Sequence, residues 1–208
     1  MKRSNRTAIA LAALLPGMAL ADSSLSDLQQ RWAVCQYQSL AGQKESCFST
    51  LSQQAHQASD ARHRQDAGLL IWSAIIDSSW AGAKGGLGAL SLVKQARSDL
   101  EQAIALDPGA LQGSAWTSLG ALYYQVPGWP IGFGDKAKAE QMLKKALALN
   151  PDGIDPNYFY GDYLLKQDKP DQAKPYFDRA LKAAARPGRE IADAGRRRDI
   201  ESDLAKIR

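Results

Sequence analysis

The sequence has few of the residues on which catalytic and metal sites depend. Only two histidines and two cysteines occur among its 208 residues. His56 and His63 have only Asp60 between them as a further ligand, which predicts solvated helix surface and not a metal site. No strand is expected before the glycines of residues 82–88, so they do not indicate a phosphate-binding loop. Because no local Ser–His–Asp or Cys–His pattern occurs either, we expect no catalytic residues, no metal and no cofactor.

The chain also lacks an apolar run long enough to cross a bilayer, which takes roughly 20 residues. The short run Ala8–Leu15 follows three basic residues and ends at Pro16-Gly17. Ala19-Leu20-Ala21 then places small residues before a cleavage site at Asp22. This order is typical of a secretory signal peptide. We therefore predict a signal peptide over residues 1–21 and a mature protein that is periplasmic or secreted, with no stable membrane insertion after cleavage.

A strong net charge of either sign is missing as well. The chain has 26 basic and 22 acidic residues, and three of the basic ones lie in the predicted signal peptide, which leaves 23 against 22. Such a balance gives no overall field that would attract nucleic acid. The basic run 196–198 is flanked by carboxylates, and the spacing predicts ion pairs of Arg197 with Asp193 and Glu201 on a solvated helix. We expect no nucleic-acid partner.

The two cysteines are an even number, which in an oxidising compartment favours a disulfide. Cys35 and Cys47 lie in two segments expected to be helical, on either side of the turn at Ala41-Gly42. A bridge between them would join the two helices of a hairpin, a closure worth about 3 kcal/mol in the chain-entropy model. The alternative is a pair of free buried thiols.

Three segments share a spacing of alanine, a large apolar residue, alanine and proline. They are Ala96, Leu100, Ala103 and Pro108; Ala139, Leu143, Ala146 and Pro151; and Ala173, Phe177, Ala180 and, slightly late, Pro187. Steps of three and four place these side chains on one helical face. Alanine lets two helix axes approach, and proline ends the helix. The pattern predicts repeated helical hairpins.

A second pattern precedes two of these segments: Trp116-x2-Leu119-Gly120-x2-Tyr123, and Tyr160-Gly161-x2-Leu164. With both patterns the chain resembles the tetratricopeptide-repeat (TPR) family, whose unit of 34 residues combines W-x2-L-G-x2-Y, A-x3-F and a proline. The resemblance implies an all-α fold, a right-handed stack of antiparallel helical hairpins. We predict an N-terminal hairpin within residues 22–60, TPR-like repeats over 61–187 and a polar C-terminal capping helix within 188–208. The expected helices are roughly 24–40, 44–59, 61–80, 89–106, 112–125, 135–150, 156–167, 170–185 and 188–206.

The resemblance also implies a concave groove lined by the first helix of each unit. The groove residues that it places here are Ser114, Thr117, Ala121, Tyr124, Asp155, Tyr158, Asp162, Leu165 and Lys166. Such a mixture of aromatic rings, carboxylates and an ammonium suits an extended peptide or a helix. It predicts a protein–protein interaction module or scaffold with a protein or peptide partner in the cell envelope, and not an enzyme. The oligomeric state stays open.

The turn before Ala139 is longer than the repeat pattern requires and contains Trp129, Ile131 and Phe133 among prolines and glycines. This loop, residues 126–135, either packs back on the helices or forms a lid or partner contact. Together with the nearby tyrosines it resembles, more loosely, the T component of tripartite ATP-independent periplasmic transporters. That resemblance implies an alternative role in handling small molecules or lipids. The alternative requires an enclosed apolar cavity walled by Trp129, Phe133 and the tyrosines.

Overall fold

Every regular element within residues 24–207, the part of the chain that the computed structural model describes, is a helix. The elements are α1 (Leu25–Tyr37), a 3-10 turn η1 (Ala41–Gln43), α2 (Lys44–Ala61), α3 (Ala67–Lys84), α4 (Ala89–Leu106), α5 (Ala110–Gln125), α6 (Lys136–Leu149), α7 (Ile154–Leu165), α8 (Pro170–Leu181) and α9 (Glu190–Leu204). The predicted all-α class is confirmed, whereas the predicted signal peptide lies outside the described residues. In that described part, no helix combines the length and the apolar character that crossing a bilayer requires.

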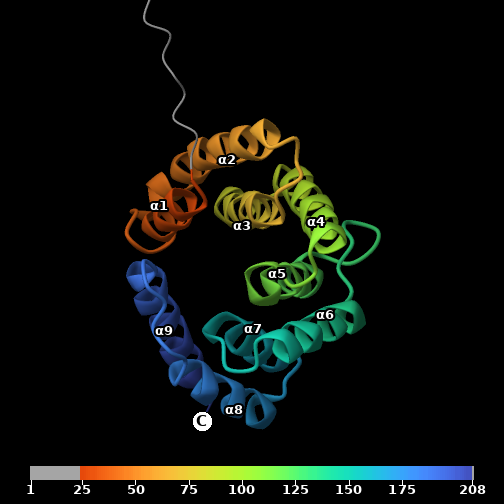
Figure 1. Cartoon of the computed structure of the whole chain (residues 1–208). Helices are drawn as coiled ribbons and strands as arrows, with labels where there is room; N and C mark the ends of the chain where they lie inside the picture. The colour runs from red at the N-terminus through yellow and green to blue at the C-terminus, as the bar shows by residue number, and fades with distance from the viewer. Residues whose placement is uncertain (1–23, 208) are drawn as a thin grey trace, which may run out of the picture.

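The helices form consecutive hairpins that curve into a ring. Figure 1 shows α3, α5 and α7 on the inside of the ring and α2, α4, α6 and α8 around the outside. Helix α9 packs on α8 and α7 and also on α1, so the last helix meets the first. The predicted stack of helical hairpins is confirmed. The C-terminal helix stands at the end of the stack as expected, but it closes the ring instead of covering one end against solvent.

The alanine pattern found in the sequence is the core of this stack. Its nine alanine, leucine and phenylalanine residues, from Ala96 to Ala180, are all completely buried. Two glycines let the helices of a hairpin approach: a Cβ on Gly120 would lie 2.7 Å from Leu143, and one on Gly161 would lie 2.8 Å from Phe177. Both distances are shorter than carbon contacts allow, so each hairpin requires glycine at that position.

Helix α3 begins at Ala67 and not near residue 61 as predicted. His63 and Arg64 have φ angles of 52° and 54°, which interrupt the right-handed helical path after α2. Asp66 then starts the new helix, because its carboxylate accepts a hydrogen bond from the Leu69 amide at 3.0 Å. Residues 62–66, which were predicted as the beginning of the helix 61–80, are therefore a short connection between α2 and α3.

The contacts that close the ring centre on Tyr37, the last residue of α1. Its hydroxyl donates a hydrogen bond to Asp199 Oδ2 at 2.9 Å, and its ring lies directly against Gly195 of α9. A disulfide joins Cys35 to Cys47, with the Cα atoms 5.7 Å apart, as the sequence predicted. The bridge fixes α1 to α2, so the surface on which α9 closes is itself covalently held.

Candidate functional site

The ring surrounds a cavity of about 1090 Å³. Its walls come from the inner helices α3, α5 and α7, from α1 and α2, and from the connection between α8 and α9. The aromatic side chains that line it are Trp32, Tyr37, Phe48, Trp72, Tyr158 and Phe159. The amide and hydroxyl side chains that line it include Gln29, Gln36, Gln112, Gln125, Ser78, Ser114 and Ser118. The cavity therefore offers flat apolar surfaces and neutral hydrogen-bonding groups side by side.

The predicted groove residues divide into two sets in the structure. Ser114, Thr117, Ala121, Asp155 and Tyr158 line the cavity. Tyr124, Asp162, Leu165 and Lys166 are not among the cavity residues. They follow the first set along α5 and α7, in the last turns of these helices, where α5 packs on α7.

The second set is engaged with itself. Tyr124 donates a hydrogen bond to Asp162 Oδ2 at 2.6 Å, and Lys166 donates to the same oxygen at 2.9 Å. The ammonium of Lys166 also lies 5.0 Å from the centre of the Tyr124 ring. Burial raises the pKa of Tyr124 well above its usual value, and the Asp162 charge raises it further. Tyr124, Asp162 and Lys166 therefore bind one another, and their part in a binding groove stays a prediction.

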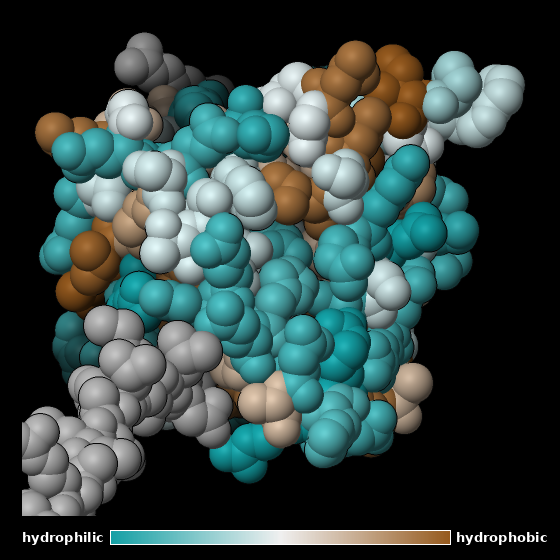
Figure 2. Space-filling model, turned by 90° about the horizontal axis from the view of Figure 1, so that it is seen from above, coloured by the Kyte–Doolittle hydropathy of each residue, from teal (hydrophilic) through white to brown (hydrophobic). Residues whose placement is uncertain are grey.

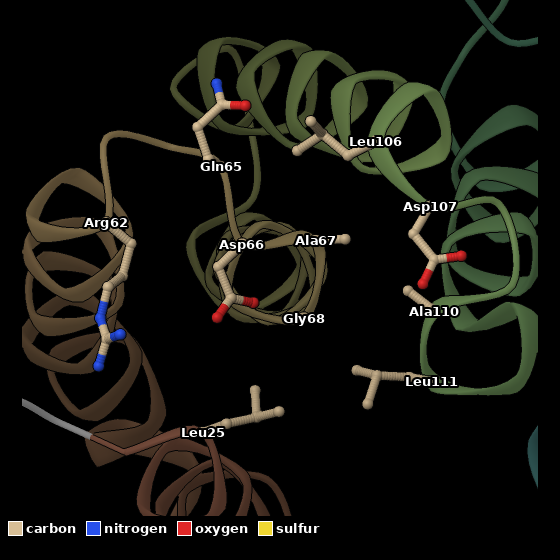
Figure 3. A pocket seen from close by; sticks show the side chains of 10 residues that line it. All are labelled: Leu25, Arg62, Gln65, Asp66, Ala67, Gly68, Leu106, Asp107, Ala110 and Leu111. Atoms are coloured by element: carbon tan, nitrogen blue, oxygen red, sulfur yellow. The ribbon is translucent and has the colours of Figure 1, made fainter.

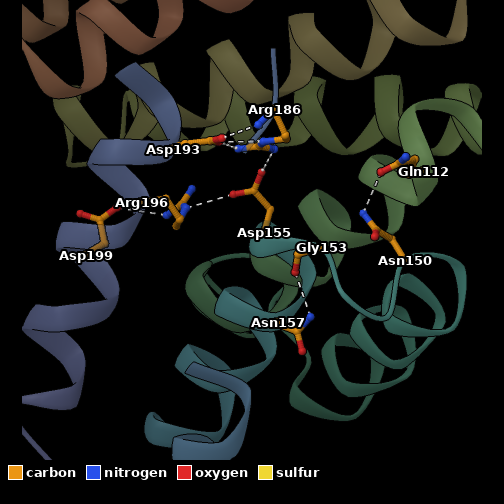
Figure 4. A network of polar contacts seen from close by, with 9 residues as sticks. All are labelled: Gln112, Asn150, Gly153, Asp155, Asn157, Arg186, Asp193, Arg196 and Asp199. Atoms are coloured by element: carbon orange, nitrogen blue, oxygen red, sulfur yellow. Dashed lines mark hydrogen bonds and ion pairs between the residues drawn. The ribbon is translucent and has the colours of Figure 1, made fainter. Parts of the chain in front are cut away.

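Asp155, which was expected to face a partner, is instead the centre of a charged network (Figure 4). It accepts hydrogen bonds from Arg186 Nη1 at 2.7 Å and from Arg196 Nε at 3.0 Å. Arg186 also pairs with Asp193, and Arg196 with Asp199. Burial opposes the charge of Asp155, but Arg196 and Arg186 outweigh it and lower its pKa to about 2. The network ties α7 to α9 and completes one wall of the cavity.

The ion pairs predicted for Arg197 are not found among the described residues. Its guanidinium donates hydrogen bonds to the backbone oxygens of Leu181 and Ala183, at the end of α8. The prediction was wrong because it assumed that α9 is solvated on all sides of the arginine run. Since α9 packs on α8, Arg197 satisfies the free carbonyls at the C-terminal end of that helix.

The 126–135 loop lies outside the cavity lining. Phe133 packs back, with its ring 5.6 Å from the ring of Tyr123 and under the guanidinium of Arg97. Trp129 and Ile131 point outward and are 90% and 60% exposed. The cavity required by the small-molecule alternative, walled by Trp129 and Phe133, is therefore not the one observed.

Exposed apolar side chains concentrate in the turns inside hairpins. The four most exposed large ones of the described chain are Trp129, Leu87, Leu40 and Ile131, from the α5–α6, α3–α4 and α1–α2 turns. An ion pair of Lys84 with Glu45 at 3.0 Å places the α1–α2 and α3–α4 turns next to each other. Figure 2, which views the ring from the side of α2, shows a mainly hydrophilic surface with hydrophobic atoms gathered toward its upper edge.

One buried cluster combines ligand types that bind metals, and the sequence did not indicate it. His56, Asp77 and Asp99 offer ligand atoms within 4.8 Å of one another, between α2, α3 and α4. His56 Nε2 lies 2.9 Å from Asp77 Oδ2, a hydrogen bond that raises the pKa of His56, and Arg64 pairs with Asp99. Asp77 therefore already binds His56 and Asp99 already pairs with Arg64, so we interpret the cluster as a layer of polar contacts between the helices. The three residues belong to separate helices, so no local motif connects them.

A second depression, of about 720 Å³, lies at the start of α3 (Figure 3). Leu25 and Leu111 point toward it, while Asp66 and Asp107 contribute its acidic groups. Both carboxylates serve local structure, because Asp66 caps α3 and Asp107 accepts a hydrogen bond from the Gly109 amide at 2.8 Å. The central cavity is therefore the better candidate for a binding site.

Comparisons with known proteins found matches to tetratricopeptide repeats. Residues 131–194 match the sequence model of the tetratricopeptide repeat. The crystal structure of a thermophilic TPR protein from Thermus thermophilus is similar over 86% of this chain and 99% of that chain, with 18% identical residues and a TM-score of 0.43. No curated protein matches the chain in sequence.

Proposed function

Because this chain is a tetratricopeptide-repeat protein, with a fold that suggests a protein–protein interaction module, we propose that it binds a peptide segment of a protein partner inside the helical ring. The chain acts by holding this segment and not by catalysis. The observation that carries the proposal is the lining of the central cavity.

That lining matches the needs of a peptide. A bound backbone requires hydrogen-bonding partners, which glutamine and serine side chains such as Gln29, Gln112 and Ser114 provide. Bound side chains require apolar surface, which Ile75 of α3 and Phe159 of α7 provide from opposite elements of the ring. The closed ring holds these groups in place before binding, so little free energy is lost in ordering them.

The proposed compartment is the cell envelope or the extracellular space. The signal peptide predicted over residues 1–21 is the main support, and the Cys35–Cys47 disulfide is typical of oxidising compartments. Expression with the native leader in a bacterium, followed by fractionation and mass measurement, tests the proposal. We expect an oxidised chain that begins at Asp22 in the periplasm, and a cytoplasmic chain that retains Met1 would contradict it.

Small-molecule binding is the second candidate, and one observation favours it. Because α9 closes the ring on α1, a long partner cannot simply lie across an open groove. The volume of about 1090 Å³ is close to the range of ligand pockets, which is roughly 300–1,000 Å³. Native mass spectrometry of the purified protein distinguishes this candidate, since a carrier would retain a compound of defined mass.

A displayed library of random linear peptides tests the proposed function. We would select on the mature protein and on two variants that each gain a tryptophan. Ser118→Trp fills the cavity, because Ser118 lines it, whereas Ser98→Trp adds the same bulk on the exposed surface of α4. We expect peptides that bind the wild type and Ser98→Trp but not Ser118→Trp. Peptides that bind all three proteins equally would place recognition outside the ring, and a failure to select any would contradict the function.

A further inference from the structure

Three arginines from the C-terminal segment line the cavity, and one of them differs from the others. Arg186 and Arg196 are held by carboxylates. Arg189, the residue just before α9, makes no hydrogen bond or ion pair through its side chain with any residue in the range 24–207. Its Nε atom is nevertheless buried. A buried donor without an acceptor costs free energy, and the Arg189 guanidinium has no acceptor within the described residues.

The environment of Arg189 orients it for that purpose. Its guanidinium carbon lies 4.8 Å from the centre of the Trp72 ring, which α3 contributes to the cavity lining. Stacking on one face leaves the N–H groups at the edge of the guanidinium plane, where they match the two oxygens of a carboxylate. Burial lowers the pKa of Arg189 and the charge of Arg186 lowers it further, whereas Asp155 and Asp193 act in the opposite direction. The attraction of an added anion would offset both unfavourable effects.

The charges of the cavity are consistent with an anionic ligand group. Its lining contains four cationic residues, Lys44, Arg186, Arg189 and Arg196, and three carboxylates, Asp152, Asp155 and Asp199. Asp155 and Asp199 are engaged with Arg196, and Asp152 is exposed to solvent, where its charge is screened. Among the described cavity residues, Arg189 is thus a cation that makes no direct ion pair with a carboxylate.

We propose that Arg189, stacked on Trp72, binds a carboxylate of the captured segment, so that the ring selects acidic peptides. This inference rests on the proposed peptide-binding function. The carboxylate belongs to an aspartate or glutamate side chain or to the C-terminus of the segment, and both present the same pair of oxygens.

Isothermal titration with peptides selected from the library tests the inference. Arg189→Gln removes the charge and should lower the affinity for an acidic peptide by roughly ten- to a hundredfold, as expected for a hydrogen bond to a charged group. Arg189→Lys keeps the charge but loses the planar pair of donors. Its affinity for the acidic peptide should therefore lie between those of the wild type and Arg189→Gln. Arg179→Gln is the matched control, because Arg179 also stacks on an aromatic ring, Tyr176, but lies outside the cavity. It should bind like the wild type.

Changes in the peptide complete the test without altering the fold. Replacing its acidic side chain by the amide should weaken binding to the wild type and have no further effect on Arg189→Gln. If only C-terminal amidation has this effect, the recognised carboxylate is the chain end. Selected peptides without acidic residues, or equal affinity for wild type and Arg189→Gln, would overturn the inference and leave peptide binding intact. Failure to select any peptide would instead contradict the proposed function itself.

Discussion

The α1–α9 junction that closes the ring includes a close contact of Gly195 with Tyr37, which a single methyl group should disturb. A Cβ added to Gly195 would overlap with the ring carbons of Tyr37, well inside the 3.4 Å at which ordinary contact begins. Tyr37 cannot readily move aside, because its hydroxyl is bonded to Asp199 and its ring packs edge-on against Trp32, 5.9 Å between centres. The substitution Gly195→Ala should therefore push α9 away from α1.

The expected loss follows from two opposing effects. Overpacking costs about 1–3 kcal/mol, and the better helix propensity of alanine returns about 1 kcal/mol. We expect Gly195→Ala to lower the free energy of unfolding by about 1 kcal/mol. Gly82→Ala is the control, because Gly82 is also within a helix but no atom lies within 4 Å of its added Cβ. It should raise the free energy of unfolding by up to about 1 kcal/mol.

Urea denaturation followed by circular dichroism measures both changes. The loss at Gly195 should disappear in a background that carries Tyr37→Ala, because the obstructing ring is then absent. If Gly195→Ala stabilises the protein as much as Gly82→Ala does, α9 does not rest on α1 and the ring is open. The ring would then not enclose the cavity.

Three further predictions concern the disulfide, the charged network and the aromatic loop. Replacing Cys35 and Cys47 together by serine should lower the free energy of unfolding by about 3 kcal/mol, and a reducing agent should then have no additional effect on the denaturation midpoint. Because the pKa of Asp155 is about 2 in the folded protein and 3.8 in the unfolded chain, its contribution of about 2 kcal/mol is present above pH 4 and is lost as the pH falls toward 2. Acid titration of Asp155→Asn should lack this component. Trp129→Ala should change the free energy of unfolding by less than about 0.5 kcal/mol, whereas Phe133→Ala should lower it by about 2 kcal/mol. Equal effects of the two substitutions would contradict the assigned packing of the loop.

The elements and their packing were largely predictable because the information is local. Alanines seven positions apart, such as Ala96 and Ala103, mark the face on which two helices meet, and this signal lies within a single helix. The disulfide was also predictable from the sequence, since Cys35 and Cys47 belong to neighbouring helices. The start of α3 was missed because the residues that interrupt the helix, His63 and Arg64, carry no glycine or proline signal.

The candidate site was only partly predictable, because closure of the ring brings together residues that are far apart in sequence. Tyr37 and Asp199 are separated by 162 positions, and no short pattern in the sequence connects them. The charges of α9 were interpreted as a solvated surface, although Arg196 points inward to Asp155. The repeat register correctly indicated the inner helices, but it could not show which carboxylates on them are already neutralised by arginines.

The meeting of α1 and α9 has a consequence for how the protein opens. In a linear array of repeats each end has a single neighbour, so the ends fray first and unfolding spreads inward. Here the terminal helices support each other, and loosening either one breaks contacts on both of its sides. Slow amide hydrogen exchange should therefore extend to both ends of the described chain. A peptide segment held inside the closed ring would dissociate no faster than the ring opens.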